Sequence, residues 1–386
     1  MEEDDEATAP IMEPSVWENL GPDMLMKVLA HLPSPSCLRF RAVCKGWKAI
    51  IDSPQFLEFC SEMWMERPWF LVFQRLEIDA VHMYDPRDRK WYTFPLSFLP
   101  IPVCGRAAAG SLLCVEERED TFFKALYICD PLAKTWIKLP PMMEETYWRS
   151  RSVTLMVDEF VGAFKVLVGC NFRLQVYDSL STSWDGLGQA PRQRLGQAPT
   201  ISAGYCRLRS TLYCLSPSLG FDIVPQPYQL LSFNMDEERW MLVNIKMPKC
   251  LTYPHLTENE DHSRIMMVGG VWKKKMVRSL RIWELNLEKH SWDKVARVPD
   301  RHWKQLAAGN WNTACAWSGE WISIASLNRV LAYNLSNGEW VLSPPSGANP
   351  THGPLMSIFP FKPAFGSHTR ILEPPNEDHI GVPMDL

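Results

Sequence analysis

The sequence predicts a small all-α head followed by an all-β, six-bladed propeller. Three observations favour this fold class. Short segments with a proline in their first turn and apolar residues at helical spacing fill residues 20–63. After residue 69, short runs rich in Val, Leu, Phe, Tyr and Trp are separated by Gly, Pro, Asn and Asp, which is typical of strands and turns. One hairpin pattern then recurs six times at intervals of 45 to 56 residues, a period expected of propeller blades.

The first helix is predicted to begin at Pro22 and to end before Pro33. Proline suits the first helical position because its missing N–H has no partner there. Apolar residues follow at i, i+3, i+4 and i+7, which places them on one face of the helix. These residues are Leu25, Val28, Leu29 and Leu32.

Two further helices are predicted from the same starting signal, a serine followed by a proline, at Ser34-Pro35 and at Ser53-Pro54. Each signal precedes an apolar set at helical spacing. The sets are Cys37, Phe40, Cys44 and Trp47, and then Phe56, Phe59, Cys60 and Met63. Because about 50 residues bury little surface, apolar side chains left on the helix faces favour a partner.

This series of prolines and apolar residues resembles an F-box over about residues 15–60, through the "VCKGW" core and the "DSPQF" end. The residues Leu20-Gly21-Pro22 depart from the adjacent Leu-Pro of many F-boxes. The alternative is a plain helical bundle packed on its own domain. The resemblance implies binding to a Skp-type adaptor, and through it to a cullin. The adaptor-binding residues it implies are Leu20, Pro22, Leu25, Val28, Leu29, Leu32, Pro33, Leu38, Val43, Cys44 and Trp47.

The recurring hairpin is marked by a tryptophan with an Asp or Asn six residues before it. An apolar or aromatic residue precedes each Asp or Asn. Asp and Asn side chains can accept hydrogen bonds from backbone amides two residues on, so this sequence pattern predicts a strand, a tight turn and a returning strand. The tryptophans are Trp91, Trp136, Trp184, Trp240, Trp292 and Trp340, and we expect them to pack between blades.

The longest interval, 56 residues between Trp184 and Trp240, contains a tandem duplication of "LGQAP" with an offset of eight residues. Removing the offset returns the interval to 48, so an insertion between blades three and four is predicted. The turn "YDPRDRKW" and the pair Gly269-Gly270 resemble kelch repeats, here over residues 69–363. This resemblance implies four-stranded blades in a closed ring.

Blade one lacks one strand before its tryptophan, while residues 355–363 form a spare strand-like run near the C-terminus. We therefore expect this run to complete blade one and to protect its edge. The predicted organisation is a disordered acidic tail (1–14), an F-box helical domain (15–66), a kelch-like six-bladed propeller closed by a C-terminal strand (67–366) and a flexible C-terminal tail (367–386).

The whole chain resembles plant F-box/kelch-repeat proteins. This resemblance implies a substrate receptor of a Skp-cullin-F-box (SCF) ubiquitin ligase complex, which binds a protein target for ubiquitination without catalysing a reaction itself. The target is not predicted. By family resemblance, the substrate-binding candidates are Arg173, Phe221, Trp272, Lys273, Lys274 and Lys275, where an aromatic side chain beside cations suits an acidic partner. The alternative for each of them is an ordinary exposed loop, and for the lysine run a solvated turn.

Composition excludes several classes of function. A net charge of −4 disfavours nucleic-acid binding, and no apolar run is long enough to span a membrane. The acidic start "MEEDDE" lacks the apolar core of a signal peptide, which predicts a cytoplasmic or nuclear protein. The 11 scattered cysteines are expected to be reduced and mostly buried.

Propellers also host oxidases and glycosidases, so an enzyme is the alternative from another class. No catalytic motif is present, and the nine histidines show no ligand-like spacing, so no metal or cofactor is predicted. The carboxylate pairs Glu116-Glu117 and Glu237-Glu238 are expected in solvated turns. An F-box/kelch scaffold that does not assemble into a ligase is a further alternative.

Overall fold

The computed structural model describes two compact units, residues 1–65 and 66–386. The described residues are 20–32, 37, 40, 43–51, 53, 55–56, 59–60, 69–74, 80–118, 125–143, 152–158, 161–170, 173–189, 206–208, 210–217, 228–274, 276–306, 314–326, 329–346 and 355–363. The predicted tails at 1–14 and 367–386 lie outside them.

The N-terminal unit contains α2 (Pro22–Ala30) and α4 (Lys45–Ile51). Pro22 occupies the first turn of α2, as predicted. Leu25 and Leu29 are buried. The Cys37 thiol donates a hydrogen bond of 3.0 Å to the Leu29 carbonyl. Farther along, the Phe56 amide donates to the Ser53 hydroxyl at 3.3 Å, which is the predicted capping interaction.

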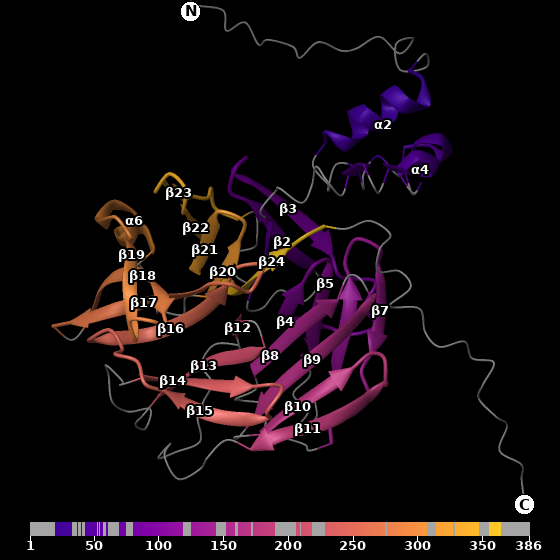
Figure 1. Cartoon of the computed structure of the whole chain (residues 1–386). Coiled ribbons are helices and arrows are strands. Elements are labelled where there is room, and N and C mark those ends of the chain that lie inside the picture. Colours follow the sequence, from indigo (N-terminus) through magenta and orange to yellow (C-terminus); the bar gives the residue numbers. More distant parts are fainter. Residues whose placement is uncertain are drawn as a thin grey trace, which may run out of the picture. The chain divides into compact units, whose positions relative to one another are not determined.

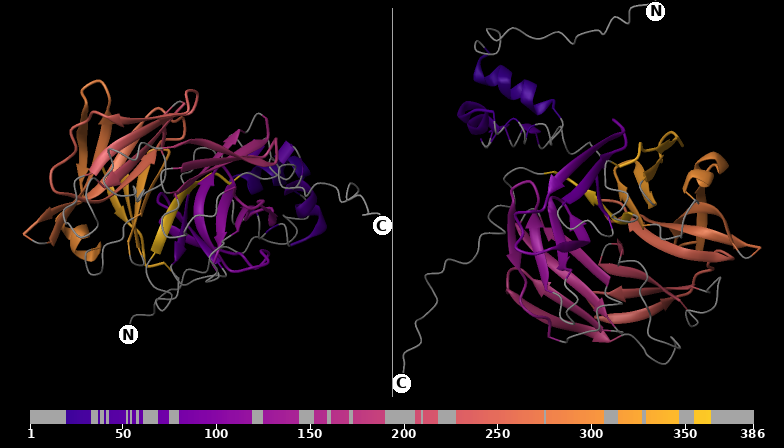
Figure 2. Two further views of the ribbon diagram at one scale, coloured as in Figure 1. Left: turned by 90° about the horizontal axis from the view of Figure 1, so that it is seen from below. Right: turned by 180° about the vertical axis from the view of Figure 1, so that it is seen from behind.

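The C-terminal unit contains six antiparallel four-stranded sheets, each one blade of a propeller. Figures 1 and 2 show these sheets arranged around a common axis. Blade one contains β24 (Leu355–Phe361), β1 (Trp69–Gln74), β2 (Ala80–Asp85) and β3 (Lys90–Pro95). Blade two contains β4 (Val103–Ala109), β5 (Leu112–Glu117), β6 (Leu126–Asp130) and β7 (Thr135–Lys138). Blade three contains β8 (Ser152–Asp158), β9 (Ala163–Cys170), β10 (Arg173–Asp178) and β11 (Ser183–Gln189).

The remaining blades follow the same order. Blade four contains β12 (Cys206–Leu208), β13 (Thr211–Pro217), β14 (Tyr228–Asn234) and β15 (Arg239–Val243). Blade five contains β16 (Leu251–Glu258), β17 (Ile265–Lys273), β18 (Met276–Asn286) and β19 (Ser291–Arg297). After α6 (Asp300–Leu306), blade six contains β20 (Ala314–Ser318), β21 (Trp321–Ser326), β22 (Arg329–Asn334) and β23 (Trp340–Leu342).

The ring closes through β24, the segment expected to complete blade one. It runs antiparallel to β1, with Trp69 opposite Phe361 and Leu71 opposite Phe359. All six residues of β1 are buried. The last strand of the propeller therefore joins its first one and supplies the inner strand of blade one.

The predicted hairpin is confirmed in all six blades. In each, the side-chain oxygen Oδ1 of the Asp or Asn accepts backbone N–H bonds of 2.8 to 3.3 Å from the turn. The tryptophan stands directly opposite the residue that precedes this Asp or Asn. In blade six, for example, the Tyr333 and Trp340 rings lie 4.6 Å apart.

Each turn also contains a left-handed residue two positions before its tryptophan, which the sequence analysis did not predict. The φ angles at these positions range from 49° to 73°. The residues are Arg89, Lys134, Thr182, Glu238, His290 and Gly338. Only one of them is glycine, so five side chains occupy a backbone conformation that glycine adopts more readily.

The repeated tryptophans connect neighbouring blades. The indole N–H of Trp91 donates to the Pro344 carbonyl at 3.0 Å, and that of Trp184 donates to the Pro140 carbonyl at 2.8 Å. The indole N–H of Trp292 points in the same way to the Met247 sulfur at 3.2 Å. Each acceptor follows the last strand of the preceding blade, so these tryptophans pack between blades.

The hydrophobic core lies between blades. Separate clusters of buried side chains join blades two and three, three and four, four and five, five and six, and six and one. In the cluster of blades three and four, Leu167 and Leu174 pack with Leu212 and Phe233. Each blade thus buries its apolar faces against its neighbours.

One prediction for blade two is wrong. Glu116 and Glu117 end β5 and do not lie in a turn. Glu116 is fully buried and forms an ion pair with Arg106 on the neighbouring strand β4. The apolar run Leu112–Val115 extends the strand, and a buried carboxylate is tolerated there because a guanidinium pairs with it.

Truncation after Gly353 is expected to unfold the propeller, since it removes β24 and leaves the buried strand β1 without one of its two partners. Circular dichroism and thermal unfolding would measure this loss. Truncation after Pro363, which retains β24, is the matched control and should unfold cooperatively near the wild-type temperature. A cooperative transition in the shorter variant would contradict this account of ring closure.

Thr182→Gly is expected to stabilise the propeller by about 1 kcal/mol, because an exposed β-branched residue with φ of 54° is strained. Gly338→Ala, at the same position in blade six, should destabilise it by a similar amount. Urea unfolding of both variants checks the pair. A less stable Thr182→Gly protein would show that the turn is not strained.

Candidate functional site

The helical head exposes apolar side chains that form no part of its core. Val43 is 60% exposed and Met24 54% exposed, and Val28 and Phe59 are also exposed. Among the predicted adaptor-binding residues, Pro22 and Cys44 are exposed, whereas Leu20, Leu32 and Trp47 are half-buried. Pro33 and Leu38 lie outside the described residues.

Two predicted contact residues are placed differently from the prediction. Leu25 and Leu29, expected on an exposed stripe, are buried inside the head. The face of α2 that carries them supplies the head's own core, and Val28 lies on the exposed side of the same helix. Met24 was missed, although it precedes Val28 by four residues and therefore shares its face.

The propeller contains a cavity of about 840 Å³ at one end of its axis. Its walls come from the inner strands of all six blades, β4, β8, β12, β16, β20 and β24. The turns between first and second strands add Gly110, Val161 and Glu260. The cavity is therefore the mouth of the central channel, with a volume typical of ligand sites.

A carboxylate network closes one side of this mouth. Glu260, on the turn between β16 and β17, accepts hydrogen bonds from the Ser318 hydroxyl at 3.0 Å and the Gly319 amide at 3.2 Å. Its other oxygen lies 2.6 Å from the Lys362 ammonium. One side chain of blade five thus binds residues that follow the inner strands of blades six and one.

Two further acidic groups near the mouth are paired. The Glu258 carboxylate lies 3.3 Å from the His262 ring and accepts a hydrogen bond from the Arg207 amide. Burial raises the pKa of Glu258, and the hydrogen bond from His262 lowers it. In blade three, the hydrogen bond from Lys165, 2.9 Å away, lowers the pKa of Asp178.

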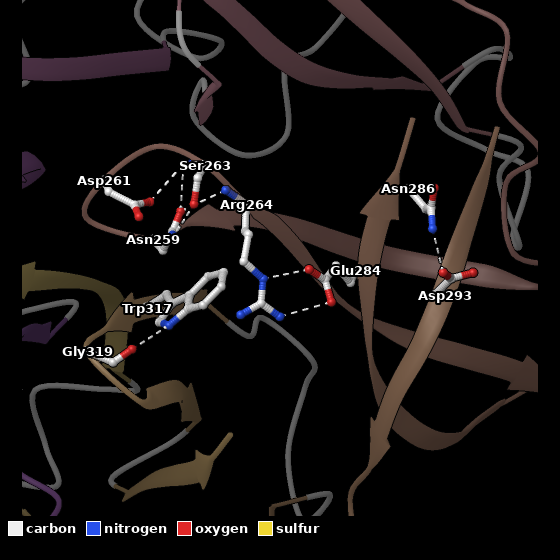
Figure 3. A network of polar contacts seen from close by, with 9 residues as sticks. All are labelled: Asn259, Asp261, Ser263, Arg264, Glu284, Asn286, Asp293, Trp317 and Gly319. Carbon is white, nitrogen blue, oxygen red and sulfur yellow. Dashed lines mark hydrogen bonds and ion pairs between the residues drawn. The ribbon is translucent and has the colours of Figure 1, made fainter. Parts of the chain in front are cut away.

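The turn between β16 and β17 is held rigidly against blade six (Figure 3). Asn259 accepts backbone bonds from Ser263 at 3.0 Å and from Arg264 at 2.8 Å. The Arg264 guanidinium makes two bonds to Glu284, of 2.6 and 3.0 Å, and its central carbon lies 5.3 Å from the Trp317 ring centre. Arg264 and Glu260 of this turn thus each have a charged partner.

Those predicted substrate-binding residues that the structure describes lie at the opposite end of the ring. Strands in a blade are antiparallel, so the turn between the second and third strands is at the other end from the remaining two turns. Arg173 begins β10 in blade three, after such a turn. In blade five, Trp272 is half-buried and Lys273 and Lys274 are exposed. Phe221, Lys275 and the Arg173 side chain lie outside what the structure describes, and blades three and five do not bring their candidates together.

The buried cysteines lack the character of nucleophiles. All those described are free thiols, and most are buried. Burial raises the pKa of Cys60, Cys214 and Cys315 to about 12, so these thiols stay protonated near neutral pH.

No group of three His, Cys, Asp or Glu side chains comes together as a metal site within the described part of the chain. None of the described helices has the length and hydropathy needed to cross a membrane.

Comparison with known proteins adds sequence relationships to this geometry. Residues 17–59 match the F-box domain. F-box only protein 6 of Arabidopsis thaliana is 28% identical over 346 residues, which cover 86% of this chain and 70% of that protein. An F-box/kelch-repeat protein of the same plant is 23% identical and is matched over 85% of this chain and 82% of its own length.

A further relative is SKP1-interacting partner 15 of Arabidopsis thaliana, which is 22% identical over 75% of this chain and 82% of its own length. Each of these relatives thus aligns with three quarters or more of this chain. With an F-box domain, six four-stranded blades and these relatives, the chain is an F-box/kelch protein of the plant type.

Proposed function

We propose that this protein is the substrate receptor of an SCF ubiquitin ligase. In this proposal the head binds a Skp-type adaptor, which connects it to a cullin, and the propeller binds the protein that is ubiquitinated. The observation that carries the proposal is an F-box over residues 17–59 in a compact unit separate from a six-bladed propeller. The name of SKP1-interacting partner 15, a relative over most of the chain, supports the same partner.

The exposed apolar residues of the head fit an adaptor interface. Met24 and Val28 lie on one face of α2, and Val43 and Phe59 belong to the following segments. Covering a Val, Met or Phe side chain completely is worth about 1.5 to 3 kcal/mol each. Several such side chains together supply enough apolar contact for a stable interface. Leu25 and Leu29 contribute indirectly, because their burial fixes the position of α2.

A receptor of this kind acts by position and carries out no bond chemistry. Binding a target beside a ubiquitin-charged enzyme converts a bimolecular encounter into an effectively intramolecular one. Such a protein needs a rigid binding surface and a separate attachment point. The propeller provides the surface, and the head provides the attachment.

Val28→Glu combined with Val43→Glu is expected to weaken adaptor binding at least about tenfold, because it buries unpaired charges at the interface. Both positions are exposed, so helical circular dichroism should stay at the wild-type level. Pull-down with a purified Skp-type adaptor measures the effect. Gln55→Glu, an exposed change that adds charge without removing apolar surface, is the control.

Leu29→Glu should behave differently, since it places a charge in the core of the head and therefore unfolds the helices. Wild-type adaptor affinity in the Val28/Val43 double variant would contradict the assigned surface. Failure of the unmodified chain to bind any Skp-type adaptor would contradict the proposed function itself.

A further inference from the structure

One corner of blade five carries unpaired positive charge. It is formed where β16 begins, β17 ends and β18 begins, at the end of the ring opposite the cavity. The Trp272 amide donates to the Cys250 carbonyl at 2.8 Å, and Lys273 stands opposite Met276, so the three segments are adjacent. The blade-five corner is defined here as Lys249, Tyr253, Trp272, Lys273, Lys274, Met276 and Arg278.

The strand segments that lie at this corner contain no acidic residue. Residues 239–257 and 262–283 lack Asp and Glu entirely. Lys249, Lys273, Lys274 and Arg278 are exposed. None of these four side chains has an ion-pair or hydrogen-bond partner among the described residues. The described part of this corner therefore carries only positive charge, on a chain whose net charge is −4.

The contrast with the other end of the ring is informative. There, Lys165, Arg264 and Lys362 each pair with a carboxylate at 2.6 to 2.9 Å. Those cations stabilise turns and connections between blades. The cations of the blade-five corner have no such internal role, which leaves them available for an external partner.

Apolar side chains lie among these cations. Tyr253 is 45% exposed and Met276 48% exposed. Trp272 is half-buried, and no described residue accepts a hydrogen bond from its indole. Burial raises the pKa of Tyr228 and a hydrogen bond from the Tyr253 backbone lowers it, which places a second tyrosine beside the first. Large aromatic side chains next to cations are the composition of binding hot spots.

The backbone at this corner is held in an unusual conformation. Cys250, Tyr253 and Lys274 have φ angles of 58°, 45° and 51°. A left-handed conformation is costly for a bulky residue such as tyrosine. At Tyr253 this conformation coincides with an irregularity in β16 between Thr252 and His255, where its pairing with β17 shifts. This irregularity leaves Tyr253 exposed on an otherwise mostly buried inner strand.

The glycine pair of blade five makes this arrangement possible. A Cβ atom on Gly269 would lie 2.7 Å from Leu251 Cδ1, and one on Gly270 would lie 2.8 Å from Val277 Cγ1. Any larger residue would therefore force the Leu251 and Val277 side chains to move. The glycines allow the close approach that positions Tyr253 and Trp272 beside the lysines.

We propose that the blade-five corner binds an acidic segment of the target protein, with an apolar side chain of that segment packed against Tyr253 and Trp272. This inference rests on the proposed function and names the chemistry of its substrate. An acidic peptide matches both the unpaired cations and the exposed aromatic surface. Nucleic acid fits less well, since its affinity depends on many phosphate contacts and the corner offers four described cations.

The test uses the full chain in complex with its Skp-type adaptor. A phage-displayed library of random peptides is selected on this complex and counter-selected on the Lys273→Glu/Lys274→Glu variant. Enriched sequences are expected to carry net negative charge together with an aromatic or aliphatic residue. Enrichment of neutral or basic sequences, or no enrichment that depends on the two lysines, overturns the proposal.

The best selected peptide is then measured by fluorescence anisotropy. Lys273→Glu/Lys274→Glu should weaken its binding at least about tenfold, and added salt should weaken binding to the wild type. Lys90→Glu/Lys289→Glu carries the same change of charge on two turns at the opposite end of the ring and should bind as the wild type does. An equal loss in both variants would reveal a non-specific charge effect and would contradict the assignment.

Tyr253→Gly separates binding from stability. Because glycine tolerates a φ of 45°, this variant should keep or raise the melting temperature while peptide binding falls at least about tenfold. A purely structural role for Tyr253 would leave peptide affinity unchanged. A single-stranded oligonucleotide that binds the corner more tightly than the selected peptide also overturns the proposal.

The same complex keeps the two proposals distinct. Corner variants leave the head unchanged, so they should bind the adaptor as tightly as the wild type does. If adaptor binding is normal and no acidic peptide is selected, the inference about the corner is wrong and the ligase assignment stands. If the unmodified chain does not bind the adaptor, the ligase assignment is wrong whatever the peptide result.

Discussion

The propeller depends on the pairing of β24 with β1. These strands are separated by almost the whole propeller in sequence, yet they share one sheet and bury every residue of β1. Without this pairing, blade one would lack its inner strand and the ring would have two exposed edges. Every interface between blades relies on the ring being closed, because each apolar cluster is shared by two neighbours.

The two ends of the ring differ in how their charges are used. At the cavity end, Glu260, Arg264 and Glu258 join turns of neighbouring strands and blades through paired, directional contacts. At the other end, blade five exposes lysines and aromatic side chains that have no comparable partners among the residues that the structure describes. A rigid ring can therefore stabilise itself with one face and recognise a partner with the other.

The repeated hairpins could be predicted from the sequence because their causes are local. The turn needs an Asp or Asn at its start, and the tryptophan must face the residue that precedes this Asp or Asn. Both requirements therefore appear in the sequence as a fixed spacing. The ring closure followed from counting strands. The left-handed residue in each turn could not be predicted in this way, because five different non-glycine residues occupy that position and only Gly338 is a glycine.

Features that depend on packing were harder to predict. A helical stripe shows which residues share a face, but Leu25 and Val28 are only three residues apart, and the rest of the head decides which of them is buried. Glu116 has the sequence context of a turn, and its burial depends on Arg106 from another strand. The exposure of Tyr253 depends on a strand irregularity that only the three-dimensional pairing defines.

The sharing of cores between blades also limits how such a chain can change over time. Each blade shares its apolar core with its two neighbours, so loss of one blade would expose apolar surface on both. A ring with one blade fewer would need a different geometry at every interface between blades. Changes in the length of the connections between blades are not limited in this way. The duplicated "LGQAP" segment begins at Leu187 near the end of β11, and its second copy lengthens the connection from blade three to blade four, so new sequence in this architecture is expected to accumulate in such connections.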